Sequence, residues 1–333
     1  MSAFLSILPD VKRRFGGLMA SLAAPAGVVF GPLLPMAAAG LALAALATLL
    51  ARHWWLADLA THFRLHYALG GLGAVALALL LKRRRMALLL LALTLPQAPL
   101  QHLWGMASLV RLEPAIAAAP SPAALRVTTL NVLWTNRQTD RIVDHVRAAD
   151  PDVLVIQESW REFWPALAAL DRLYPYRAPA DIAATDDVAL FSRYPIRRAE
   201  QVAIGRTGLA YPVAEIDVDG RPVTVIGVHP PWRRSVAASA MRDRYLADVA
   251  ARVARLDMPV VVAGDFNSTV WSPTFGDFLA RSGLSIAGDG RLWRPTWPAR
   301  LPALGIAIDH VAVTDGLSAR GMSRGPGGGG GGG

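Results

Sequence analysis

A long stretch without charge restricts the fold of this chain more than any other feature. No charged side chain occurs between Arg14 and Arg52. A helix needs roughly 20 apolar residues to cross a bilayer, so this interval is long enough for a membrane span. Prolines up to residue 35 confine the predicted helix to about Leu33–Ala51.

Two further intervals are long enough to cross a bilayer. Residues 65–81 are apolar and nearly continuous, and no Asp, Glu, Lys or Arg occurs between Arg85 and Arg111. The sequence therefore predicts a membrane region with about three transmembrane helices. Basic clusters at 12–14 and 82–85 indicate the cytoplasmic side, because loops rich in Lys and Arg stay there. With three crossings we expect a multi-pass protein of the cytoplasmic (inner) membrane, with its soluble part on the extracytoplasmic side.

The composition changes sharply near residue 120. We expect a membrane region at 1–112, a Pro/Ala-rich linker at 113–124, a soluble domain at 125–324 and a glycine tail at 325–333. The net charge of +9 comes mainly from residues 1–120, which hold ten Lys or Arg against three acidic residues. The soluble part is close to neutral, which disfavours a dedicated DNA-binding protein. A transporter or channel is also disfavoured, because the predicted spans contain no acidic residue.

Two apolar strand patterns of the soluble part end in amide or carboxylate side chains. The run 125–130 ends at Asn131, and the run 151–156 ends at Gln157 and Glu158. Enzymes built on sheets place reacting groups at such strand ends, and Mg²⁺ prefers one or two carboxylates together with water and substrate oxygens. Glu158 is therefore the best single candidate for a metal ligand. The competing interpretation is a solvated side chain at the end of a strand.

A predicted hairpin leads to a candidate histidine. Asp219-Gly220 is a strong turn signal between two strand patterns, and the second strand ends at His229 before a Pro-Pro bend. A lone histidine is more often packed or exposed without a catalytic role. At the end of a strand, however, it is well placed to donate to a phosphoryl or leaving-group oxygen.

The sharpest local signal is a buried strand that runs into Gly264. Asp265 and Asn267 follow it, and residues two apart in extended backbone share one face, so both side chains can point at one centre. A turn that favours Asp and Asn locally is the alternative. Asp309 and His310 are neighbours in a later strand pattern, so we expect only one of them to face the site.

These motifs, in this order, resemble those of the endonuclease/exonuclease/phosphatase superfamily, which has a deoxyribonuclease-like fold. The motif residues are Asn131, Gln157-Glu158, Ser192-Arg193, His229-Pro230, Gly264-Asp265-Phe266-Asn267 and Asp309-His310. The resemblance covers about residues 125–314 and implies an α+β domain folded as a four-layer αββα sandwich. The membrane region is similar to that of bacterial membrane-bound members.

The resemblance also implies roles for these residues. Mg²⁺ (or Mn²⁺) would be held by Glu158, with Asn131 orienting the metal or the substrate phosphate. The implied catalytic residues are His229, Asp265, Asn267 and Asp309, and the implied substrate-binding residues are Asn131, Arg193 and His310. The implied function is membrane-anchored, metal-dependent hydrolysis of a phosphodiester or phosphoester. The substrate would be a nucleic acid, a lipid head group or a small molecule, and the lipid bilayer is the other expected partner.

The C-terminal end departs from the pattern of the superfamily. Its members normally finish with a strand that carries Ser-Asp-His, whose imidazole is held by the acidic residue that is Asp309 here. Residues 319–326 contain no such pair, and glycine follows to residue 333. A glycine run buries no side chain, so it cannot form a core strand. We therefore expect a frameshifted or truncated reading frame with weakened activity and stability, and a natural glycine tail is the alternative. The alternative function is a catalytically inactive, membrane-anchored binding domain.

Overall fold

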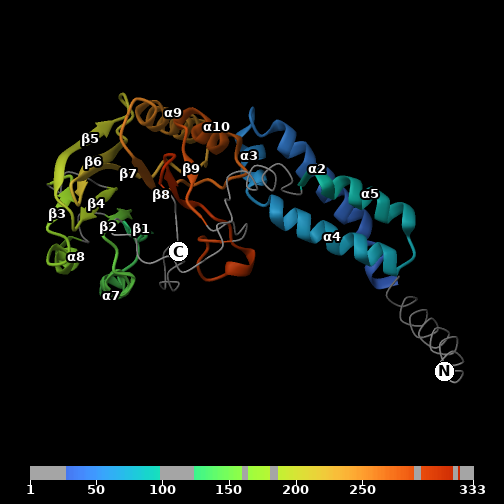
Figure 1. Cartoon of the computed structure of the whole chain (residues 1–333). Helices are drawn as coiled ribbons and strands as arrows, with labels where there is room; N and C mark the ends of the chain where they lie inside the picture. The colour runs from blue at the N-terminus through green and yellow to red at the C-terminus, as the bar shows by residue number, and fades with distance from the viewer. Residues whose placement is uncertain are drawn as a thin grey trace, which may run out of the picture. The chain divides into compact units, whose positions relative to one another are not determined.

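The chain consists of two compact units, Met1–Leu100 and Gln101–Gly333 (Figure 1). The computed structural model describes residues 28–97, 124–159, 164–180, 187–288, 294–317 and 322. Most of the predicted linker at 113–124 and the whole glycine tail at 325–333 lie outside these residues, as does the segment in which the superfamily carries its last strand.

The first unit is helical because Ala and Leu, both strong helix formers, dominate its sequence. Its helices are α2 (Leu33–Leu50), α3 (Trp55–Thr61), α4 (Arg64–Leu80) and α5 (Arg84–Thr94), and a 3₁₀ turn follows as η1 (Leu95–Gln97). Leu34, Leu41 and Leu90 belong to the apolar core of this unit. The outer side of α2 is apolar as well, with Leu43 and Leu49 exposed, a pattern typical of a helix that faces lipid.

The prediction of about three spans is corrected by this unit. Within the described part of the chain, Val28–Leu50 is the one helix long and apolar enough to cross a membrane, with a mean hydropathy of 2.1. Helices α3 and α4 meet at a bend of 60°, and they form a second span only if the two together make one broken transmembrane helix. His62 and Arg64 lie at this bend. Of the third interval, α5 has 11 residues, about 16 Å of helix against roughly 30 Å of hydrocarbon. Mean hydropathy along the sequence does not reveal where a helix bends or ends.

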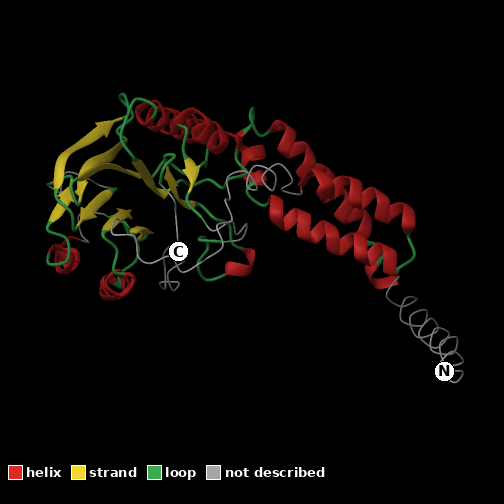
Figure 2. Ribbon diagram, in the orientation of Figure 1, coloured by secondary structure: helices red, strands yellow, loops and turns green. Residues whose placement is uncertain are grey.

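Two β-sheets form the second unit (Figure 2). The first has the order β1 (Val127–Asn131), β2 (Val153–Gln157), β4 (Ala189–Ser192), β3 (Tyr176–Ala178). The second has the order β5 (Ile196–Ala203), β6 (Ala210–Val218), β7 (Arg221–Val228), β8 (Val260–Asp265), β10 (Asp309–Val313), β9 (Ser285–Ile286). Neighbours are parallel in β1–β2 and β7–β8 and antiparallel elsewhere. The predicted hairpin is confirmed, since β6 and β7 pair up to Val218 and Arg221.

Alternating side chains of one strand fill two different cores. In β2, Val155 joins Val225 and Ala263 of the second sheet in one apolar cluster. Its neighbour Ile156 faces the other way, into a cluster that Val146 of α7 (Thr139–Ala149) shares. Because successive strand residues point to opposite faces, the first sheet packs on the second with one face and on helices with the other. The helix α8 (Trp164–Asp171) contributes Leu170 to the same helical side.

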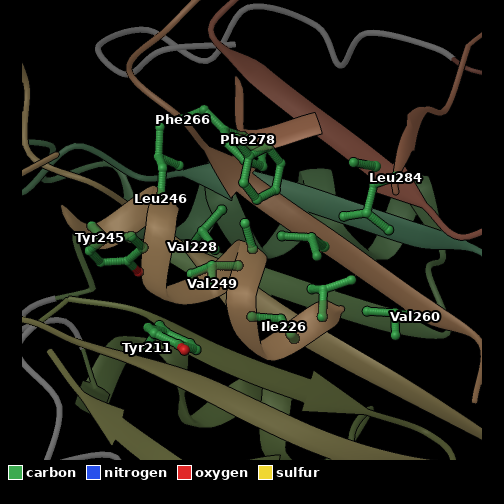
Figure 3. Packing of buried hydrophobic residues seen from close by; sticks show 14 of the residues in the cluster. Tyr211, Ile226, Val228, Tyr245, Leu246, Val249, Val260, Phe266, Phe278 and Leu284 are labelled. Atoms are coloured by element: carbon green, nitrogen blue, oxygen red, sulfur yellow. The ribbon is translucent and has the colours of Figure 1, made fainter. Parts of the chain in front are cut away.

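Helices also cover the outer face of the second sheet. In α9 (Val236–Val253), Leu246 and Val249 pack with Ile226 of β7, and α10 (Pro273–Ser282) adds Phe278 to this cluster (Figure 3). The side chain of Ser235 accepts the backbone N–H of Ala238 and so caps the first turn of α9. The two sheets therefore lie between two helical layers, which is consistent with the predicted αββα sandwich.

Candidate active site

Strand direction brings the polar strand ends together at one edge of each sheet. Asn131 of β1 lies beside Gln157 of β2 in a parallel pair, so Glu158 follows at the same edge. In the second sheet, β7 and β8 are also parallel, with Val228 beside Gly264. His229 and Asp265 therefore follow these two residues at a common edge, because parallel strands end on the same side.

Gly264 permits the close approach of β8 to β7. A Cβ atom on this glycine would lie 1.9 Å from the carbonyl oxygen of Val228, far inside van der Waals contact. A residue with a side chain would push the two strands apart, and with them His229 and Asp265. The glycine of the predicted motif is thus required by packing.

Asn131 connects the two sheets through its side-chain amide. Its Nδ2 donates to Oε1 of Glu158 at 2.9 Å and to Oδ2 of Asp265 at 3.1 Å. The backbone N–H of Leu133 donates to its Oδ1 at 2.9 Å, which fixes the orientation of the amide. Asn131 therefore acts here as a donor that positions two carboxylates, and its oxygen is engaged by backbone. This arrangement favours an orienting role over the predicted direct ligation of metal.

Glu158 is held from both its side chain and its backbone. Its Oε2 accepts the backbone N–H of Trp134 at 3.0 Å, and its own N–H donates to Oδ1 of Asp187 at 3.1 Å. The residue adopts the left-handed region with φ 57°, which is costly for a residue with a long side chain and clusters at functional sites. The unfavourable backbone conformation of Glu158 therefore serves to direct its carboxylate toward this edge of the sheet.

His229 faces Glu158 and is fixed by a carboxylate that sequence reasoning missed. Its Nδ1 lies 2.7 Å from Oδ1 of Asp187, and its Nε2 lies 4.0 Å from Oε1 of Glu158. Burial alone would lower the pKa of His229, but the charge and hydrogen bond of Asp187 and the charges of Asp265 and Glu158 raise it to about 10. The imidazole is therefore an imidazolium at neutral pH, and its Nε2 lies within ion-pair distance of Glu158.

Asp265 and Asn267 are joined by a local turn, which was the alternative to the predicted shared face of an extended strand. The backbone N–H of Asn267 donates to Oδ1 of Asp265 at 2.7 Å, while its side-chain Nδ2 donates to the carbonyl oxygen of Pro230 at 3.1 Å. Asn267 is left-handed, with φ 48°, a conformation that asparagine tolerates well. The carbonyl oxygen of Asn267 accepts from the guanidinium of Arg242 at 3.2 Å, and Arg242 is fully buried. Burial raises the pKa of Asp265, although His229 opposes this effect.

Asp309 lies directly beside Asp265. The first residue of β10 pairs with the last residue of β8, so Asp309 and Asp265 are opposite one another on antiparallel strands. Asp309 is 9% exposed, and neither of its carboxylate oxygens has a hydrogen-bond partner among the described residues. Burial and the charge of Asp265 raise its pKa well above the usual range. The two carboxyl groups form a like-charge pair in which proton uptake is favoured.

Two predicted substrate-binding residues lie elsewhere. Arg193 follows β4 at the end where Ser192 pairs with Val153, the first residue of β2, and it forms ion pairs with Asp150 and Asp152. That is the edge of the sheet opposite to Glu158, because β4 runs antiparallel to β2. The prediction for Arg193 is therefore not supported by its position.

His310 faces away from Asp309, as alternation in a strand requires. Its ring packs against Phe266 and Phe275, with centroids 5.7 and 4.8 Å away, and its Nε2 lies 2.9 Å from the carbonyl oxygen of Ser268. Burial lowers the pKa of His310 to about 4. It is a neutral core histidine, and the predicted role in substrate binding is not supported either.

The side chains at this site suit a metal cation that retains most of its hydration shell. In the described part of the chain, no group of three or more His, Asp or Glu side chains is arranged to hold a metal ion. Mg²⁺ needs no such cage, because it is commonly bound by one or two carboxylates and completes its shell with water and phosphate oxygens. Glu158, with both oxygens oriented by N–H donors, fits this kind of ligation. Soft or histidine-bound metals do not fit these donors.

Several solved structures are similar to this chain, and the match with a TM-score of 0.50 agrees with the fold. SmcL is 20% identical with a TM-score of 0.50, and the match covers 61% of this chain and 87% of that protein. Sphingomyelinase C from Streptomyces griseocarneus is 25% identical with a TM-score of 0.45, covering 59% and 85%. Truncated TDP2 from Caenorhabditis elegans is 14% identical with a TM-score of 0.48, covering 59% and 86%. No curated protein sequence matches the chain.

A family model gives the decisive match. The model described as Endonuclease/Exonuclease/phosphatase family matches residues 128–330. This range includes Asn131, Glu158, His229, Asp265 and Asp309, and it is more than half of the chain. The chain therefore belongs to the endonuclease/exonuclease/phosphatase family.

Proposed function

We propose that this chain is a hydrolase of phosphodiesters or phosphoesters that depends on Mg²⁺ (or Mn²⁺). One observation carries the proposal: the amide of Asn131 holds Glu158 and Asp265, one from each sheet, while Nε2 of His229 lies 4.0 Å from Glu158. Carboxylates for a hard cation and an imidazolium for a phosphate anion thus share one edge.

Each side chain has a role in this proposal. Glu158 binds the metal ion, which would neutralise charge that develops on phosphate oxygens. His229 donates from Nε2–H to a phosphate oxygen, since its Nδ1–H is held by Asp187. Asp265 and Asn267 position the attacking water, and Asp265 accepts its proton. The raised pKa of Asp265 suits a general base, because a carboxylate with an ordinary pKa is a weak proton acceptor at neutral pH.

Metal binding and turnover test the proposal separately. The full chain in detergent should hydrolyse bis(p-nitrophenyl) phosphate with Mg²⁺ or Mn²⁺ and stop when EDTA is added. Glu158→Gln should abolish both the turnover and the rise in melting temperature that Mg²⁺ causes. Asp150→Asn is the matched control, because Asp150 is an exposed carboxylate at the opposite edge. Equal metal-dependent turnover in wild type and Glu158→Gln would remove the basis of the proposal.

A catalytically inactive binding domain is the second candidate. It is favoured by the carboxylate of Asp309, which has no hydrogen-bond partner among the described residues. Buried carboxyl groups are normally hydrogen-bonded, so one without a partner is expected where a site has lost a side chain that it needs. The two candidates differ in a simple way: the inactive domain predicts a melting shift with Mg²⁺ and no turnover. Appending a strand that carries Ser-Asp-His to the chain should then restore hydrolysis.

We further propose that the protein is anchored in the cytoplasmic membrane with its second unit on the extracytoplasmic side. The apolar helix at Val28–Leu50 supports one crossing, and the basic residues at 12–14, which precede it in the sequence, favour a cytoplasmic N-terminal side. Because the chain contains no cysteine, single cysteines report topology cleanly. In intact spheroplasts, a membrane-impermeant maleimide should label Tyr176→Cys, on the exposed strand β3, and should label Ser6→Cys, on the N-terminal side of the span, only after lysis. The opposite pattern would reverse the topology.

A further inference from the structure

A set of exposed apolar side chains lies on two segments that adjoin residues of the candidate active site. It consists of Trp232, Trp297, Leu301 and Leu304, which we call the apolar rim; their exposed fractions are 51%, 42%, 59% and 64%. The two indole rings lie together, with centroids 6.4 Å apart. Leu301 precedes the short turn η4 (Pro302–Leu304) and Leu304 ends it, and this turn belongs to neither sheet. Large side chains of this kind are normally buried, so an exposed group of them indicates a binding surface.

Both parts of the rim are tied to residues of the site. Trp232 is three residues beyond His229, and the intervening Pro230 accepts a hydrogen bond from the side chain of Asn267. Trp297 follows Thr296, whose hydroxyl oxygen accepts the backbone N–H of Asp309 at 3.2 Å. Whatever binds the rim is therefore brought next to the groups that act on a phosphate.

The backbone under the rim is well fixed. Trp297 exchanges backbone hydrogen bonds with Ile306 at 3.0 and 2.7 Å. A Cβ atom on Gly305 would lie 2.7 Å from the Cβ of Pro295, so the two segments of this loop pack tightly against each other. The exposed leucines thus project from an ordered loop, and burying them in a partner costs little conformational entropy of the backbone.

The chemistry of the rim favours lipid over nucleic acid. Tryptophan prefers the interface between water and bilayer, where its ring is apolar and its N–H stays hydrated. Aliphatic Leu301 and Leu304 gain from acyl chains but offer no flat surface for a base, which binds by stacking on aromatic rings. Arg234 and Arg300 are exposed beside the rim and suit the phosphates of lipid head groups.

Charge and anchoring support the same choice. The second unit lacks the large basic excess of a nucleic-acid-binding protein. The apolar helix at Val28–Leu50 can attach the chain to a bilayer, which keeps lipid at a high effective concentration. We propose that the apolar rim docks on the bilayer and presents the site to the head-group phosphodiester of a phospholipid. This assignment of substrate rests on the proposed hydrolase function, whereas docking of the rim does not.

Docking can be measured without any turnover. The full chain carrying Leu304→Cys is labelled with an environment-sensitive fluorophore and reconstituted into vesicles of phosphatidylethanolamine and phosphatidylglycerol, with or without bromine on the acyl chains. We expect a blue shift and quenching by the brominated lipid. Arg221→Cys is the matched control, because Arg221 is exposed at the start of β7, the end remote from His229, and its label should stay in water. Equal, unquenched signals at both positions would overturn docking.

The substrate class needs a second comparison. Leu301→Ser combined with Leu304→Ser should lower hydrolysis of bilayer phospholipid, relative to that of bis(p-nitrophenyl) phosphate, by about tenfold or more, because two side chains lose their burial in lipid. An unchanged ratio would overturn the lipid assignment while hydrolysis itself stands. If no diester is cleaved, the hydrolase function fails and the fluorescence result still decides docking. A label at residue 304 that responds to single-stranded DNA and not to brominated lipid would assign the rim to nucleic acid instead.

Discussion

Asp187 holds His229 through a hydrogen bond of 2.7 Å between its Oδ1 and the imidazole Nδ1, and the same oxygen accepts the backbone N–H of Glu158 at 3.1 Å. One carboxylate thus sets both the charge of the histidine and the position of the candidate metal ligand. Such supporting contacts commonly influence a site nearly as strongly as the residues that touch the substrate.

Replacing this carboxylate by an amide should impair turnover more than binding. Asp187→Asn keeps the shape of the side chain but no longer stabilises the imidazolium, so kcat should fall by roughly 10- to 100-fold with a smaller change in KM. The kinetics are measured on bis(p-nitrophenyl) phosphate at saturating Mg²⁺. Asp144→Asn, at a carboxylate 72% exposed on α7, serves as the control. A kcat equal to that of wild type would show that Asp187 has no positioning role.

The paired carboxyl groups of Asp265 and Asp309 should reduce stability at neutral pH. Burial and the neighbouring charge raise the pKa of Asp309 in the folded state. As pH rises above the ordinary pKa near 4, the unfolded chain loses this proton first, so the free energy of unfolding falls through the window up to the raised pKa.

Asp309→Asn should therefore stabilise the protein at pH 7 while it lowers activity. We expect the free energy of unfolding to rise by about 1–3 kcal/mol, with the gain disappearing near pH 4. Urea unfolding of the full chain in detergent, followed by tryptophan fluorescence, measures it. Asp144→Asn again controls for loss of a carboxylate. A variant less stable than wild type at pH 7 would contradict the like-charge relationship.

His310 should make the free energy of unfolding depend on pH in the direction opposite to that caused by Asp309. Its folded pKa is about 4, below the ordinary value near 6.5, so the unfolded chain binds a proton first as pH falls. Stability is then lost between about pH 6.5 and 4, by up to about 3 kcal/mol. In His310→Gln, which cannot titrate, this loss should be absent. The same unfolding experiment at several pH values tests it, and parallel pH profiles for the two proteins would refute it.

Sequence patterns predicted where the strands end, but they did not predict in which direction neighbouring strands run. Asn131, Glu158, His229 and Asp265 each follow an apolar strand pattern, and the structure gathers them because β1, β2, β7 and β8 run in matching directions. Arg193, assigned to the substrate by the family resemblance alone, lies at the opposite edge, since β4 is antiparallel to β2. Pairing direction is a long-range property that no local pattern contains.

The position of Asp187, which the sequence patterns did not reveal, also depends on strand direction. Asp187 precedes β4, and the beginning of an antiparallel strand lies where its neighbour ends, next to Glu158. An acidic residue before an apolar strand was the available signal, but it became informative only once the pairing was known. The alternation rule, by contrast, needed no pairing, and it predicted that either Asp309 or His310 would face the site. The bend between α3 and α4 was missed because hydropathy averages over a window.

The close approach at Gly264 yields the sharpest test of packing. In Gly264→Ala the new Cβ would meet the backbone oxygen of Val228 at 1.9 Å, and relief requires separation of two hydrogen-bonded strands. The free energy of unfolding should fall by more than about 3 kcal/mol, and the melting temperature by roughly 6–12 °C. Gly276→Ala is the matched control, because this glycine lies in α10 with nothing within 4 Å of the added Cβ. The control should gain up to about 1 kcal/mol, since alanine is the better helix former. Equal melting temperatures for the two variants would show that β7 and β8 are not in contact at Gly264.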